Sequence, residues 1–125
     1  MFLSLAHRSL DVYRESQNLV KECYNVTGFL PDCEKFGMTQ QMRRAAVSVL
    51  LNLAEGSSRR SDAEKRRFYE VSRSSIVEID ACLDLAVDLN YLNREDLKSI
   101  GVSVARTFQM LSKMINRLTQ EETQI

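Results

Sequence analysis

Hydrophobic residues cover almost the whole circumference of one predicted helix, the segment from Gln41 to Gly56. Its sequence is QMRRAAVSVLLNLAEG, and at about 100° per residue the apolar positions leave no wholly polar face. The core of a short chain covers one side of such a helix, so the opposite side needs a second cover. The pattern predicts a homo-oligomer, with whichever of Leu50 and Leu51 faces outward lying at the subunit interface.

The pattern along the rest of the chain predicts three more helices. Helices are expected over about 4–27, 39–56, 62–89 and 94–120, within a single domain that spans residues 1–125. The links between the last three helices are short, which forces antiparallel neighbours. The expected fold class is all-α, an antiparallel up-down-up-down four-helix bundle.

Local signals support these boundaries. Gly28 is typical of the end of a helix, and Thr39 is a reasonable N-cap for the second helix. Ser61 and Glu64 have the spacing of a capping box at the start of the third. In that third helix, a heptad-like seam is expected at positions 68, 72, 75, 79, 82, 86 and 89.

A polar line runs along the apolar second helix at spacings of four, four and three. A buried Arg44 requires a carboxylate partner, and Glu78 is the first candidate, with Glu55 as the alternative. We interpret the line as a network that fixes how the helices pack. Its expected members are Arg44, Ser48, Asn52, Glu55, Ser75 and Glu78.

Composition narrows the class of protein. The 125 residues include 17 basic and 17 acidic side chains, a balance that is unusual for an obligate nucleic-acid binder. Three cysteines, an odd number without metal-like spacing, favour a reduced cytoplasmic chain. The start, MFLSLAHRSL, does not have the form of a secretory signal. No apolar run approaches the ~20 residues of a membrane span, so no membrane association is expected.

Charge is nevertheless unevenly distributed. Residues 39–73 contain eight basic and four acidic side chains. This basic segment either faces phosphates, meets an acidic patch of a neighbouring subunit such as Asp80, Asp84 and Asp88, or is a solvated surface. Its candidate contacts are Arg59, Arg60, Lys65, Arg66, Arg67 and Arg73.

The sequence has no recognisable catalytic pattern. His7, the single histidine, has no partner at a spacing typical of zinc sites or catalytic triads. The glycines are scattered and form no phosphate-binding loop. We expect no enzyme activity, no catalytic residue, no cofactor and no metal site. Cys23 and Cys82 are interpreted as core residues, and Cys33 is the cysteine expected to be accessible.

Two longer stretches, LPDCEKFGMTQQMRRAAVSVLLNLAEG and RFYEVSRSSIVEID, resemble a known family. The chain is similar to the bacterial four-helix-bundle proteins encoded within intervening sequences of 23S rRNA genes. That family is related to accessory proteins of diversity-generating retroelements. The resemblance implies a ring-shaped homopentamer. Through the retroelement proteins, it also implies RNA and a reverse transcriptase as partners.

Two function classes remain open from the sequence. The first is a non-catalytic oligomeric factor associated with RNA or nucleoprotein through its basic segment. The second is a protein–protein scaffold that binds no nucleic acid.

Overall fold

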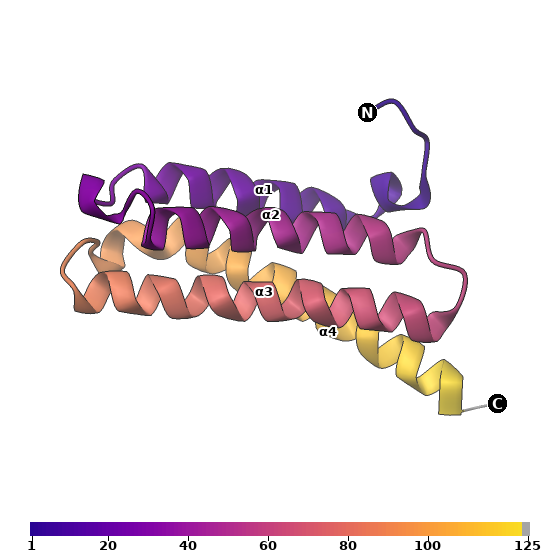
Figure 1. Ribbon diagram of the computed structural model, residues 1–125. Coiled ribbons are helices and arrows are strands. Elements are labelled where there is room, and N and C mark those ends of the chain that lie inside the picture. Colours follow the sequence, from indigo (N-terminus) through magenta and orange to yellow (C-terminus); the bar gives the residue numbers. More distant parts are fainter. Residues whose placement is uncertain (124–125) are drawn as a thin grey trace.

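The computed structural model describes residues 1–123, apart from the side chains of residues 8, 9 and 120–123. Four long helices lie side by side (Figure 1), which confirms the predicted all-α four-helix bundle. The helices are α1 (Asp11–Thr27), α2 (Met38–Ser57), α3 (Asp62–Asp88) and α4 (Lys98–Thr123). Three short 3-10 turns accompany them, η1 (Ala6–Ser9), η2 (Asp32–Glu34) and η3 (Arg94–Leu97).

Each helix packs mainly on two others. The principal contacts are α1 with α2, α2 with α3, α3 with α4 and α4 with α1, the order of an up-down-up-down bundle. The α2–α3 turn therefore lies at the same end of the bundle as the start of α1 and the end of α4 (Figure 1). None of the described helices is long and apolar enough to cross a membrane.

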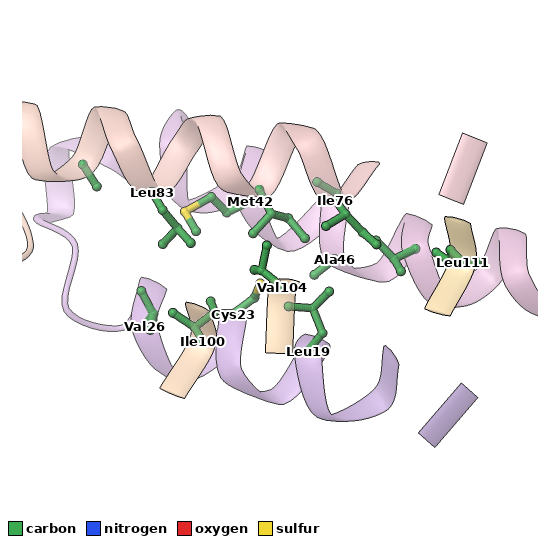
Figure 2. Packing of buried hydrophobic residues seen from close by; sticks show 14 of the residues in the cluster. Leu19, Cys23, Val26, Met42, Ala46, Ile76, Leu83, Ile100, Val104 and Leu111 are labelled. Atoms are coloured by element: carbon green, nitrogen blue, oxygen red, sulfur yellow. The ribbon is translucent and has the colours of Figure 1, made fainter. Parts of the chain in front are cut away.

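Residues from all four helices fill the core (Figure 2). Leu19, Met42, Ile76 and Leu111 are among its fully buried side chains, one from each helix. On α1 the buried positions follow spacings of four and three, the pattern of one helix face turned inward. They are Val12, Ser16, Leu19, Cys23 and Val26, and Thr27 at the end of the helix is also buried.

The core seam of α3 differs from the predicted one. Tyr69, Ile76 and Leu83 are buried, whereas Phe68 and Cys82 are half-buried and Leu89 is exposed. Ser72, Ser75, Ile79 and Ala86 are buried as expected. The prediction followed small residues at heptad spacing. Turning the helix so that three larger side chains enter the core removes more apolar surface from water.

One predicted helix start and one predicted N-cap are wrong. The first helix begins at Asp11 rather than near residue 4, because Leu10 is extended (φ −79°, ψ 133°) and separates η1 from α1. Asp11 then lies in the first turn, where a negative charge is favourable. Thr39 does not cap α2. Instead, Glu34 Oε1 accepts a hydrogen bond from the Met38 backbone N–H at 3.1 Å.

Gly37 makes this arrangement sterically feasible, because a Cβ atom there would lie 2.7 Å from Glu34 Oε1. The cap of the third helix is as predicted: Ser61 Oγ accepts a hydrogen bond from the Glu64 backbone N–H at 3.2 Å.

Candidate nucleic-acid interface

Two arginines share one aromatic ring beside the α2–α3 turn. The guanidinium carbons of Arg59 and Arg67 lie 4.7 and 5.4 Å from the centroid of the Phe68 ring. Such cation–π contacts hold a guanidinium in place while its N–H groups remain available. Together with the exposed Arg60, these residues form a surface that we name the basic turn (Arg59, Arg60 and Arg67).

A hollow of about 470 Å³ adjoins the basic turn. Ser58, Ser61 and Glu64 line it together with Arg59 and Arg60. Arg59 also forms an ion pair with Glu55 at 3.4 Å, with side chains 41% and 58% exposed. An exposed pair of this kind contributes little free energy, so its guanidinium is easily shared with an incoming anion. Guanidinium and hydroxyl donors are suited to phosphate oxygens.

The other basic candidates lie elsewhere. Arg73 donates a hydrogen bond to Ser112 Oγ of α4 at 3.2 Å. Lys65 lines a small hollow with Met114 and Arg117 of α4, and Arg66 Nε lies 4.0 Å from Glu70. The six basic candidates therefore do not form one patch, because successive residues of a helix point in different directions.

Part of the polar line forms a hydrogen-bonded cluster between α2 and α3. Ser75 Oγ donates to Ser48 Oγ at 2.9 Å, and Asn52 Nδ2 donates to the same oxygen at 3.0 Å. Ser72 Oγ donates to the Val49 carbonyl at 2.7 Å and adds a second link between the two helices. These bonds join polar groups at a closely packed helix pair.

The charged members of the polar line are not part of this cluster. Arg44, Glu55 and Glu78 are exposed, so the expected burial of Arg44 against a carboxylate is wrong within one chain. Glu78 accepts a hydrogen bond from Gln41 at 3.4 Å instead. The line drifts around the helix because a spacing of four exceeds one turn by about 40°, so Arg44 is exposed while Ser48 bonds with Ser75 of α3.

α2 has a second, outward-facing row of residues. We name it the α2 outer stripe, and it comprises Gln40, Arg44, Val47, Leu51 and Ala54 of the helix, with Ser58 at its C-cap. Leu51 is 57% exposed, whereas Leu50 is half-buried. The outward-facing leucine of the predicted interface is therefore Leu51, and its contact with another subunit stays a prediction.

An apolar groove lies between α3 and α4. This α3–α4 groove has a volume of about 410 Å³ and is lined by Val77, Asp80, Gly101, Ala105, Phe108 and Gln109, with Ile76 and Val104 beneath them. The pattern of a single helix does not reveal this groove, in which Phe108 is 38% exposed. In the sequence, the only indication of the groove is the pair of small residues Gly101 and Ala105, which are four apart on α4.

Cys23 is buried and Cys33 is exposed, as the sequence suggested, whereas Cys82 is only half-buried; all three are free thiols. Burial raises the pKa of Cys23 to about 12, with Glu22 and Cys82 adding to the effect. Burial also raises the pKa of the half-buried Cys82, and Cys33 is exposed. Within the described residues, no three histidine, cysteine or acidic side chains gather in a way that would hold a metal ion.

Comparison with known proteins identifies the family. The family model of the 23S rRNA-intervening sequence protein matches residues 8–116. The chain belongs to this family. No curated protein matches it. The fold is similar to a crystal structure described as a protein of unknown function from the S23 ribosomal protein family of Bacteroides thetaiotaomicron. The two chains are 23% identical with a TM-score of 0.76, over 83% of this chain and 97% of the other.

Several residues in the stretches that resemble the 23S rRNA-intervening sequence family shape the ends of α2. Glu34 and Gly37 form the N-terminal cap of the helix. Near the other end, a Cβ atom at Gly56 would lie 2.9 Å from Cβ of Phe68. The glycine therefore lets α3 approach and positions the ring that holds Arg59 and Arg67.

Proposed function

We propose that this chain is a non-catalytic, self-assembling protein that binds RNA through its basic turn. The observation that carries the proposal is the arrangement of Arg59 and Arg67 over the Phe68 ring, with Arg60 exposed beside them. Three guanidinium groups at one end of a bundle attract a phosphate backbone despite a net charge of zero.

The family description supports RNA as the polyanion, because it refers to the intervening sequence of 23S rRNA. Free cysteines fit a cytoplasmic location, where RNA is also present. Self-assembly is supported by the exposed Leu51 on the α2 outer stripe, and a pentamer is the expected assembly. Repetition of the basic turn in each copy multiplies a weak attraction to RNA.

The test compares two variants that lose the same charge. The first replaces Arg59, Arg60 and Arg67 with Gln. The matched control replaces Arg106, Lys113 and Arg117, three exposed cations of α4, with Gln. Binding is measured by fluorescence anisotropy with a short labelled single-stranded RNA, and the assembly state of each variant is checked by sedimentation.

The proposal predicts that the basic-turn variant loses most RNA affinity while the control retains it. Equal losses in the two variants would assign the effect to total charge rather than to the basic turn. Absence of RNA binding by the unaltered protein would overturn the RNA function and favour a protein–protein scaffold.

A further inference from the structure

Two apolar surfaces of this bundle are uncovered in the single chain. One is the α2 outer stripe, whose Leu51 projects with 57% of its surface exposed. The other is the α3–α4 groove, in which Val77 is 55% and Phe108 38% exposed above the buried Ile76 and Val104. The first surface is a ridge along one helix, and the second is a furrow between two helices.

We infer that the α2 outer stripe of one copy docks in the α3–α4 groove of the next, with Leu51 against Val77. The inference rests on the self-assembly proposed above and identifies the two surfaces that form the contact. A helix ridge fits the groove between two packed helices, as in the bundle itself. One contact of this kind covers both apolar surfaces.

Charges along the two helices are complementary when they run antiparallel. With Leu51 opposite Val77, Arg44 is seven residues before Leu51 and faces Asp84, seven residues after Val77. In the same register Glu55, four residues after Leu51, faces Arg73, four residues before Val77, in addition to their contacts with Arg59 and Ser112 in their own chains. Both pairs join opposite charges, which favours this alignment.

The parallel direction fits less well. Keeping Leu51 opposite Val77, it sets Glu55 opposite Ala81 and Val47 opposite Arg73. The parallel alignment loses the pair of Glu55 with Arg73, and it buries the Arg73 cation against Val47. Within the described residues of one chain, Arg44 and Asp84 form no ion pair with each other or with any other side chain, so both are available to a neighbouring copy.

Symmetry also selects the antiparallel direction. α2 and α3 are antiparallel within a chain, so copies related by rotation about an axis along the bundle present α2 antiparallel to α3 of the neighbour. Because stripe and groove are different surfaces, each copy uses both, and the contacts repeat until a ring closes. All copies then carry the basic turn at the same end of the assembly, where one RNA chain reaches several of them.

A two-fold contact between two α2 outer stripes is the competing arrangement. It would cover Leu51 and bring Arg44 near Glu55 of the second copy, but it would leave the α3–α4 groove open. The two arrangements differ in whether the groove is needed for assembly, and complementary variants separate them.

The experiment uses Leu51→Asp, which disables the stripe, and Val77→Asp, which disables the groove. Both side chains are more than half exposed, so the bundle still folds. Val102→Asp is the matched control, because Val102 is 54% exposed on α4 but does not line the groove. Sedimentation velocity is measured over a concentration series for each variant alone and for the two disabled variants mixed.

We expect an assembled unaltered protein and an assembled Val102→Asp control, with each disabled variant at the 14.4 kDa of one chain. The mixture should form a species of two chains, because the intact stripe of Val77→Asp fits the intact groove of Leu51→Asp. A Val77→Asp protein that assembles like the unaltered one would overturn the inference in favour of the two-fold contact.

Two further outcomes separate this inference from the proposed function. If the unaltered protein assembles but the mixture stays monomeric, the assigned surfaces are wrong and self-assembly stands. If the unaltered protein is itself a monomer, self-assembly and the assigned surfaces both fail, whereas RNA binding by the basic turn is judged by its own variants.

The charge register has its own test. Arg44→Glu and Asp84→Arg should each weaken assembly, and the double variant should restore most of it, because the exchanged pair has opposite charges again. If the loss of assembly in the double variant equals the sum of the losses in the two single variants, the pairing of Arg44 with Asp84 is overturned.

Discussion

Gly56 of α2 and Tyr69 of α3 are packed so closely that a Cβ atom at position 56 would lie 2.8 Å from Cε1 of the tyrosine ring. Tyr69 is buried, and its hydroxyl lies 3.0 Å from that of Ser57. The neighbouring Phe68 is held by the same close approach and supports Arg59 and Arg67. One glycine thus links helix packing to the geometry of the basic turn.

Gly56→Ala should therefore destabilise the bundle, although alanine is the better helix former by about 1 kcal/mol. Overpacking against Phe68 and Tyr69 should lower the free energy of unfolding by about 1–3 kcal/mol. Urea denaturation in the Leu51→Asp background measures folding without assembly. The matched control is Gly101→Ala, where no atom lies within 4 Å of the added methyl group. It should stabilise by about 0.5–1 kcal/mol, and the same gain at Gly56 would contradict the close packing.

The polar cluster and the exposed Arg44 should respond differently to substitution. Ser75→Ala removes the hydrogen bond to Ser48 and should cost about 1 kcal/mol of unfolding free energy. Arg44→Met should change it by less than about 0.5 kcal/mol, because the side chain is exposed. Urea denaturation of both variants in the Leu51→Asp background tests this. A loss of about 3 kcal/mol or more for Arg44→Met would show a buried ion pair after all.

The fold could be predicted from the sequence because hydrophobic periodicity, Ser61 with Glu64, and short links all indicate antiparallel helices. The ends of individual helices depend on the local backbone conformation. Position 10 carries no helix-breaking residue, yet its extended backbone separates η1 from α1. Asn90, in a left-handed conformation (φ 62°), follows α3, and the Tyr91 N–H bonds back to the Ala86 carbonyl. A left-handed residue just after the end of a helix is usually glycine and sometimes asparagine.

The candidate site was harder to predict, because it depends on side-chain direction and not on spacing alone. A count of charges brings six basic residues of one segment together, but the helical path turns Arg73 and Lys65 toward α4. The polar line is continuous in the sequence, whereas the hydrogen bond from Ser75 of α3 reaches it at Ser48. The α3–α4 groove combines residues from two helices, so no single stretch of sequence marks it.

The thiols should differ sharply in reactivity. Burial holds the pKa of Cys23 at about 12, so this thiol should resist a thiol reagent at pH 8. The exposed Cys33 should react first and Cys82 more slowly. The unfolded thiol has the lower pKa, 9.0, so the contribution of Cys23 to stability is complete below pH 9.0 and falls as the pH rises toward about 12. Reaction kinetics of a Cys33→Ser variant provide the measurement, and rapid labelling of Cys23 in the native protein would contradict its burial.

Glu64 lines the hollow beside Arg59 and Arg60 and should oppose the binding of phosphate. Glu64→Gln should tighten RNA binding about twofold to fivefold, the effect of removing one exposed charge. The Ser61 cap is retained, because it accepts from the backbone N–H of residue 64. Fluorescence anisotropy with the same labelled RNA measures the change. Weaker binding by this variant would indicate that the RNA lies elsewhere.

The salt dependence of RNA affinity tests the central claim most directly. Contacts of Arg59, Arg60 and Arg67 with phosphates displace counterions, so the logarithm of the binding constant should fall linearly with the logarithm of salt concentration. Three contacts to single-stranded RNA predict a slope of about −2 between about 50 and 200 mM salt, and steeper if several copies engage. The variant with Gln at all three positions should have a slope near zero. An unaltered protein that binds no RNA at about 50 mM salt, or binds it independently of salt, would contradict the account.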